Sequence, residues 1–131
     1  MNRTLVLDSG AIIAAQNNDR AITRLIDAAR RRGALVLIPS GVIAETWRGS
    51  ASQARISSVI RAAHAVPPLD LEAAKRVGVL LAHASRASAV DGSVADVALS
   101  NAPSLIATSD PDDMRALLRG VSKADVQVHA L

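Results

Sequence analysis

The sequence contains no cysteine, and its 131 residues include a single aromatic side chain, Trp47. The absence of cysteine excludes disulfide bonds and thiolate zinc sites. Without phenylalanine or tyrosine, the core has to be built from Ala, Val, Leu and Ile. Trp47 could lie in this core or dock a partner, and a core position is favoured. The chain also lacks the roughly 18 consecutive apolar residues that a membrane-spanning helix needs, and it does not open with a charged-then-apolar leader. We therefore expect a cytoplasmic protein.

A single domain over residues 1–131 is expected, because a chain of this length can bury a substantial core. Short apolar runs alternate with segments of helical periodicity. Strands are expected at 5–7, 34–38, 104–108 and 125–129, with a further short strand at 64–66. Helices are expected at 11–15 after a Ser9 cap, at 19–32, from 40 to about 47, from a turn at 49–52 to 63, and at 71–85, 91–100 and 111–119. This alternation predicts an α/β fold: a three-layer α/β/α sandwich with a central parallel sheet of four to five strands.

The net charge of +3 is unevenly distributed along the chain. Residues 20–86 hold 11 bases and 4 acids, whereas residues 91–113 hold 5 acids and no base. Of the 15 bases, 13 are arginine, which suits contacts with phosphate and stacking on nucleobases. A basic body with one acidic segment is typical of a protein that binds a polyanion around a metal site. A solvated, arginine-rich surface explains any single arginine equally well.

Four acids stand where carboxylates would meet at one edge of the sheet. Asp8 follows the strand at 5–7, and Asp110 follows the strand at 104–108. Ligands of open α/β sheets bind at this carboxyl edge. Carboxylates gathered there repel one another, and a divalent cation is the usual reason that a fold tolerates them. The candidate catalytic and metal-binding residues are Asp8, Glu45, Asp91 and Asp110.

Each of these acids also has an ordinary explanation. Asp8 and Asp110 could cap the helices that follow them, and Pro111 makes the second of these a very good helix start. Asp91 would be favoured in a first helical turn by the helix dipole whatever its role. Glu45 could pair on the surface with Arg48, three positions later.

Other polar residues are expected around the site with less direct roles. Five positions separate Asp91 from Asp96, which turns a helix by roughly 500°, so the two side chains diverge by about 140°. Both can face one ion only if Asp91 precedes the helix, and we expect Asp96 at the rim. The residues expected to support the site are Ser9, Asp96, Ser109 and Asp113. The three histidines, His64, His83 and His129, are too widely spaced to predict a ligand set.

Four segments, at 5–13, 38–48, 90–95 and 106–113, together resemble the PIN-domain family, and within it the VapC-type toxins of bacterial toxin–antitoxin pairs. The resemblance covers essentially the whole chain in the right order. It implies a PIN-like fold and an endoribonuclease that depends on Mg²⁺ or Mn²⁺. The family's four acids fall on Asp8, Glu45, Asp91 and Asp110. Ser9 matches the hydroxyl residue that usually follows the first aspartate, whereas Asp96 stands where relatives often have alanine.

The resemblance also implies partners. Asp8 and Asp91 would hold Mg²⁺, Glu45 and Asp110 would orient water, and the substrate would be RNA with an exposed loop. A VapB-like antitoxin would lie in an apolar groove, and a homodimer is expected. Residues that could line this groove, or equally belong to the core, are Ile43, Trp47, Ile56 and Val59.

Three other kinds of domain share some of these features with a nuclease. A catalytically degenerate PIN-like domain would bind RNA or protein without cutting. A phosphoryl-transfer receiver domain needs paired acids after the first strand and a lysine near the last one, but Asp8 has no acidic neighbour and Lys123 is poorly placed. A haloacid-dehalogenase-type phosphatase needs a second aspartate two residues after the first, where this chain has Gly10.

Overall fold

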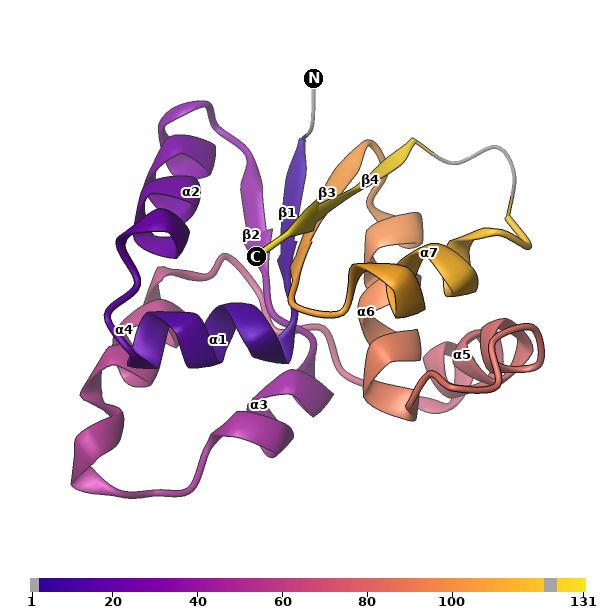
Figure 1. Ribbon diagram of the computed structural model, residues 1–131, viewed down its shortest axis with the longest axis horizontal. Coiled ribbons are helices and arrows are strands. Elements are labelled where there is room, and N and C mark those ends of the chain that lie inside the picture. The colour runs from indigo at the N-terminus through magenta and orange to yellow at the C-terminus, as the bar shows by residue number, and fades with distance from the viewer. Residues whose placement is uncertain (1–2, 122–124) are drawn as a thin grey trace.

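The computed structural model describes residues 3–121 and 125–131, so Lys123 lies outside the described part of the chain. One parallel sheet of four strands runs through the centre, in the order β2-β1-β3-β4 (Figure 1). The strands are β1 (Thr4–Leu7), β2 (Leu35–Leu37), β3 (Ser104–Thr108) and β4 (Val126–Ala130). The predicted α/β fold with a parallel sheet is confirmed.

The predicted strand at 64–66 forms only an isolated parallel bridge between Ala65 and Leu37. Pro67 and Pro68 follow it, and because proline has no backbone N–H to donate, a ladder cannot continue through them.

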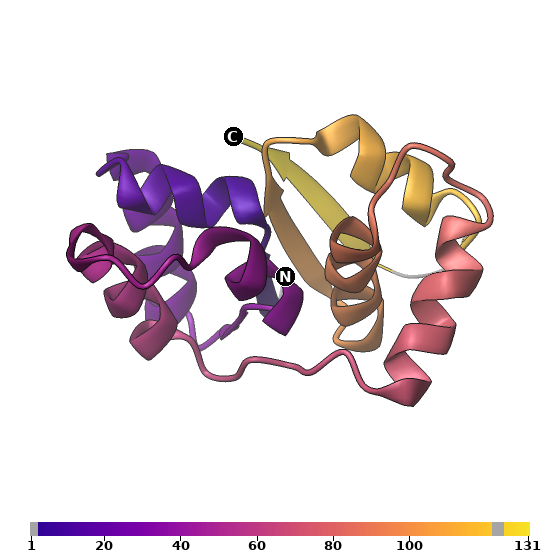
Figure 2. The ribbon, with the colours of Figure 1, turned by 90° about the horizontal axis from the view of Figure 1, so that it is seen from below.

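Seven α-helices and one 3-10 turn lie within the described residues, and they flank the sheet in two groups, α1 to α4 and α5 to α7 (Figure 2). None of these helices has the length and apolarity needed to cross a membrane. The helices are α1 (Ser9–Gln16), α2 (Arg20–Arg31), α3 (Ser40–Thr46), α4 (Ala54–Ala62), α5 (Leu71–Leu81), α6 (Ala89–Ser100) and α7 (Pro111–Leu118), with the 3-10 turn at Ala51–Gln53.

Helix boundaries differ from the prediction where capping decides them. α1 begins at Ser9 itself, with Asp8 rather than Ser9 as its N-cap. α6 begins at Ala89, two residues early, because Ser88 and Asp91 form a capping box. α5 ends at Leu81 rather than near 85.

The core is aliphatic, as the composition requires, and β1 is buried along its whole length. The prediction that Trp47 belongs to the core is wrong, because 40% of its surface is exposed. Ile56, by contrast, is fully buried, so it belongs to the core and cannot line a surface groove. The largest fully buried side chains are Leu5, Leu7, Ile12, Ile22, Ile38, Ile56, Ile106, Met114 and Leu117.

Candidate metal centre

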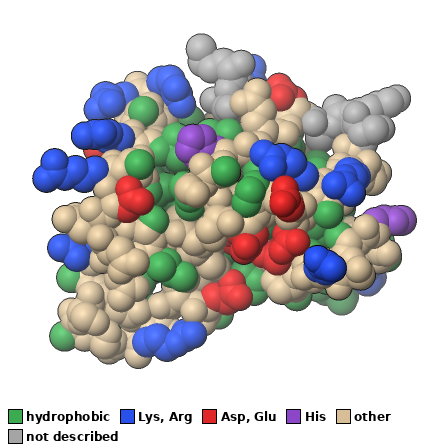
Figure 3. All heavy atoms as spheres, viewed as in Figure 1, with side chains coloured by type: hydrophobic (Ala, Val, Ile, Leu, Met, Phe, Trp, Pro, Cys, Tyr) green, Lys and Arg blue, Asp and Glu red, His purple; other side chains and the backbone are tan. Residues whose placement is uncertain are grey.

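Three of the four candidate acids meet at the carboxyl edge of the sheet. β1 and β3 pair in register, with Leu7 opposite Ala107, so the residues that follow them leave the sheet at the same level. Asp91 comes to this edge from the first turn of α6, which packs on β1 and β3. One carboxylate oxygen from each of Asp8, Asp91 and Asp110 lies within 4.8 Å of the others, and no histidine of the described residues joins them. Acidic side chains gather on this part of the surface, near the lower centre of Figure 3.

Asp8 is the buried member of this cluster, with 2% of its surface exposed. Its Oδ1 accepts a hydrogen bond from the Ser9 N–H (2.7 Å), and its Oδ2 accepts one from the Thr108 hydroxyl (2.5 Å). Burial raises the pKa of the Asp8 carboxyl above its ordinary value, the two hydrogen bonds oppose this rise, and the charges of Asp91 and Asp110 add to it. The ionised carboxylate is therefore in an unfavourable environment that a cation would relieve.

Asp110 stands at the N-cap position of α7, but its side chain makes no capping hydrogen bond. Its backbone N–H instead donates to the Thr108 hydroxyl (2.9 Å), and its carboxylate faces the cluster from the exposed side. Helix capping, the competing explanation for this residue, is not what the side chain does.

Asp91 lies inside the first turn of α6 rather than before it. One of its oxygens accepts from the Ser88 N–H (3.0 Å), so Asp91 completes the capping box of α6 and also belongs to the cluster. Asp96 points elsewhere, as the helical spacing requires. Its buried carboxylate receives two hydrogen bonds from Arg76 on α5, at 2.8 and 3.2 Å. The structure thus gives Asp96 a role in joining α5 to α6 and does not bring it to the rim.

No protein-family model matches the sequence, and no curated protein matches it either. Solved structures do match over nearly the whole length. A chain of VapBC2 from Rickettsia felis, solved bound to a DNA fragment from its promoter, aligns over 98% of both chains with a TM-score of 0.68 and 11% identity. A chain of FitAB bound to an IR36 DNA fragment aligns over 96% of this chain and 94% of its own, with a TM-score of 0.64 and 20% identity. A chain of FitAcB from Neisseria gonorrhoeae covers 95% of both, with a TM-score of 0.64 and 17% identity.

This chain has a PIN-like fold. The identities are low, so the similarity establishes the fold and leaves the chemistry to be argued from the site. In this PIN-like chain, the acidic cluster lies at the carboxyl ends of parallel strands, where open α/β folds bind ligands.

Glu45, the fourth candidate, is exposed on the last turn of α3 and is not one of the three clustered acids. Its Oε1 accepts a short hydrogen bond, 2.5 Å, from the Ser9 hydroxyl, and Ser9 directly follows Asp8. The alternative explanation, a surface pair with Arg48, does not hold, because the guanidinium of Arg48 donates to the carbonyls of Ala44 and Trp47. Glu45 thus borders the acidic cluster through Ser9.

Two further residues, Ser109 and Asp113, were expected to support the site. Ser109 is exposed between Thr108 and Asp110, and it lies against Gly10 of α1. Asp113, in the first turn of α7, borders a separate hollow that it shares with His83 and Arg86.

Thr108 is a member of the site that the sequence reasoning missed. Its hydroxyl is fully buried, donates to Asp8 and accepts from the Asp110 N–H, so one side chain links two of the three acids. The signal available in the sequence was a hydroxyl residue at the end of a buried strand, two positions before a candidate ligand.

The raised pKa of Asp8 predicts how the stability of the metal-free protein depends on pH. An unfolded aspartate loses its proton near pH 4, whereas the folded protein holds this proton up to the raised pKa. The free energy of folding that the protonated Asp8 carboxyl contributes is therefore fully present below the pKa of the unfolded state. It is lost as pH rises through the higher pKa of the folded state. Melting temperatures of the parent and Asp8→Asn, measured in EDTA from about pH 4 upward, should diverge in the variant's favour. A difference that does not change with pH would contradict this.

Proposed function

We propose that this chain is a metal-dependent endoribonuclease that acts as the toxin of a toxin–antitoxin pair. The observation that carries the proposal is the meeting of three aspartates, one of them buried, at the carboxyl ends of β1 and β3. The oxygen-only donor set suits Mg²⁺, with Mn²⁺ as the alternative, since zinc sites are built mostly on histidine and cysteine. The fold that the chain shares with VapBC2 and FitAB chains supports the same proposed function.

The chain's own residues would divide the work between holding the ion and placing the water. Asp8, Asp91 and Asp110 would hold the ion, and the hydrogen bonds from Ser9 and Thr108 fix the Asp8 carboxylate in place for it. When bound, such an ion lowers the pKa of coordinated water and neutralises charge on a phosphate. Glu45, at the edge of the centre, would orient the attacking water in line with the phosphodiester bond that breaks.

RNA is the substrate that the charge distribution favours. Arginine side chains gather over α2, at the upper left of Figure 3, and others flank the acidic cluster. Arginine contacts with the phosphate backbone would fix the position of the RNA, while unpaired bases in a loop remain free for recognition.

The decisive experiment is incubation of the purified chain with total RNA in Mg²⁺ and, in parallel, in EDTA. We expect fragments with Mg²⁺, none with EDTA, and recovery of cleavage when excess Mg²⁺ or Mn²⁺ is restored. RNA that is bound but left intact under all three conditions would overturn the nuclease and favour a catalytically degenerate binding domain.

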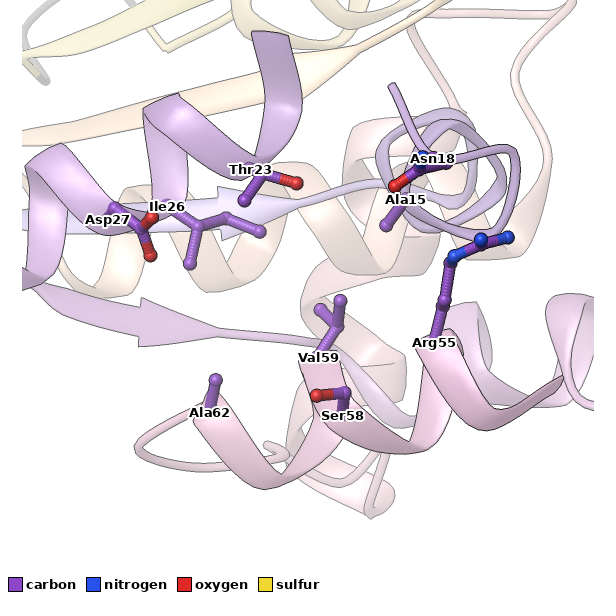
Figure 4. A pocket seen from close by; sticks show the side chains of 9 residues that line it. All are labelled: Ala15, Asn18, Thr23, Ile26, Asp27, Arg55, Ser58, Val59 and Ala62. Atoms are coloured by element: carbon purple, nitrogen blue, oxygen red, sulfur yellow. The ribbon is translucent and has the colours of Figure 1, made fainter. Parts of the chain in front are cut away.

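A cognate, VapB-like antitoxin is part of this proposal. The matched VapBC2 and FitAB structures are of complexes bound to DNA. A cavity of about 250 Å³ lies between α2 and α4 of this chain, where a segment of a partner could lie (Figure 4). Of the four residues predicted to line a groove, Val59 lines this cavity. Ile43, Trp47 and the buried Ile56 are not among its lining residues. The lining residues are Ala15, Asn18, Thr23, Ile26, Asp27, Arg55, Ser58, Val59 and Ala62.

The presence of an antitoxin can be tested with the protein encoded by the short open reading frame that is expected beside the gene for this chain. This protein, co-expressed with the chain, should bind it and suppress cleavage, and Val59→Glu should weaken that binding while the free enzyme still cuts RNA. A neighbouring product that leaves cleavage unchanged would count against it. A homodimer remains an expectation from the resemblance alone.

A further inference from the structure

The only aromatic side chain of this protein lies on its surface. Trp47 is 40% exposed, whereas the largest fully buried side chains of the core are all aliphatic or methionine. Exposed tryptophan is costly to keep in water, and tryptophan is enriched where surfaces bind ligands, because its ring combines a large apolar face with a polar edge.

The backbone that carries Trp47 is fixed by hydrogen bonds on both sides. The Trp47 N–H donates to the Ile43 carbonyl (2.8 Å), closing the last turn of α3. The side chain of Gln53, which is buried, donates to the Thr46 carbonyl (2.8 Å) and accepts from the N–H groups of Arg48 (2.7 Å) and Gly49 (3.0 Å).

The side chain of Arg48 completes this arrangement. Its Nη1 donates to the carbonyls of Ala44 (3.1 Å) and Trp47 (2.8 Å). The backbone of Trp47 is therefore held in place before any ligand arrives, and a ring presented in this way costs little conformational entropy when it binds.

Trp47 is also linked along the chain to a residue that borders the acidic centre. It follows Glu45 by two residues, and Glu45 accepts a hydrogen bond from Ser9, the residue after Asp8. Ile13, one helical turn after Ser9 on the same face of α1, is 48% exposed. Two exposed apolar side chains, Ile13 on α1 and Trp47 at the end of α3, thus stand on the two elements that the Ser9–Glu45 hydrogen bond joins.

We propose that Trp47 is a stacking platform for an unpaired base of an RNA whose phosphate backbone is held at the acidic centre. This inference rests on the proposed RNA substrate and adds to it the place where a base is held. A nucleotide suits both the acidic centre and Trp47. Its phosphate would be attracted by a metal that the carboxylates hold, and its planar base can stack on the indole ring. The positive charge of Arg48, whose guanidinium donates to the Trp47 carbonyl, suits the phosphate backbone that such a base carries.

The chain offers a direct probe of this contact. With no tyrosine and one tryptophan, its intrinsic fluorescence reports Trp47 alone. The parent protein is titrated with a single-stranded RNA oligonucleotide in Ca²⁺, in place of Mg²⁺, to limit cleavage, and separately with an oligonucleotide of the same length and charge that lacks bases. Saturable quenching by the RNA and little by the abasic strand is expected. Equal responses to both strands would overturn the stacking platform.

Variants measure what the contact contributes. Loss of one base stack typically weakens binding about 5- to 150-fold, so Trp47→Ala should raise KM for single-stranded RNA about tenfold with kcat nearly unchanged. Trp47→Phe, which keeps a ring, should recover most of the affinity, and Val79→Ala, at an exposed apolar residue of α5, should behave as the parent. Melting temperatures establish that each variant is folded.

The outcomes separate this inference from the proposed function. If the parent cuts RNA and Trp47→Ala and Trp47→Phe cut it with the parent's KM, the platform is wrong and the nuclease stands. If the parent never cuts RNA but its fluorescence is quenched only by strands that carry bases, the platform stands and the nuclease is wrong.

Discussion

Replacing Asp8 by asparagine is expected to abolish Mg²⁺-dependent cleavage and, at the same time, to stabilise the metal-free protein. The first effect follows because Asp8 is the buried member of the cluster, fixed by Ser9 and Thr108. Loss of an outer partner of a metal ligand typically costs about 10- to 100-fold, so loss of a ligand itself should cost at least about 100-fold in kcat/KM. The second follows because burial raises the pKa of Asp8, which means that the folded state is penalised when this carboxyl is ionised.

Metal should reverse the order of stability. An ion that binds only the folded protein raises its melting temperature with concentration, so Mg²⁺ should stabilise the parent and leave Asp8→Asn nearly unchanged. For a domain of this size each kcal/mol moves the melting temperature by about 2–8 °C, which a thermal scan resolves.

The matched control is Asp112→Asn. The Asp112 side chain is fully exposed on α7, pairs weakly with Arg115 three positions later, and is outside the cluster. The Asp112→Asn variant should cut RNA at the parent rate and melt at nearly the parent temperature, because exposed ion pairs of this kind contribute little to stability. Parental cleavage by Asp8→Asn in Mg²⁺, or an equal loss in Asp112→Asn, would show that the centre is not where we place it.

The parts of this site that the sequence could predict are those fixed by strand ends. Residues 104–108 were predicted as a strand and form β3 with the same bounds. Because β1 and β3 are parallel and in register, two acids a hundred residues apart had to emerge at one edge, and no side-chain detail was needed to bring Asp8 and Asp110 together.

The parts that could not be predicted depend on how helices pack. Asp96 is placed by α5 lying against α6, which brings Arg76 to its carboxylate, and no spacing within the sequence encodes that approach. The hydrogen bond between Glu45 and Ser9 depends on where α3 lies relative to α1. Trp47 was assigned to the core because large apolar residues usually lie there, but Gln53 and Arg48 hold its backbone at the surface.

The close contact between Gly10 and Ser109 leads to the second large expected effect, in Gly10→Ala. A Cβ at position 10 would lie 2.2 Å from the Ser109 hydroxyl oxygen, 2.7 Å from its Cβ and 3.0 Å from its backbone nitrogen. Rotation of the serine hydroxyl relieves only the first of these contacts, so α1 and the loop after β3 must move apart. Asp8 caps α1 and Asp110 follows Ser109, so the movement separates two of the three aspartates.

We expect Gly10→Ala to lose about 1–3 kcal/mol of stability, the usual cost of an overpacked contact, and to lose more than tenfold in both Mg²⁺ affinity and cleavage. Thermal scans against Mg²⁺ and RNA cleavage rates measure these. The matched control is Gly78→Ala on α5, where an added Cβ has no heavy atom within 4 Å. Alanine is favoured over glycine inside a helix, so this control should gain roughly 0.5–1 kcal/mol and cut RNA normally.

A double variant separates steric displacement from any other effect of the alanine. Gly10→Ala with Ser109→Gly removes both side-chain atoms that the new Cβ meets and leaves only the 3.0 Å approach to the backbone nitrogen. Because the two positions touch, their effects should not be additive, and the double variant should recover much of the Mg²⁺ affinity that the single one loses. If the double variant is no better than Gly10→Ala alone, the spacing between α1 and the loop after β3 does not control the metal centre.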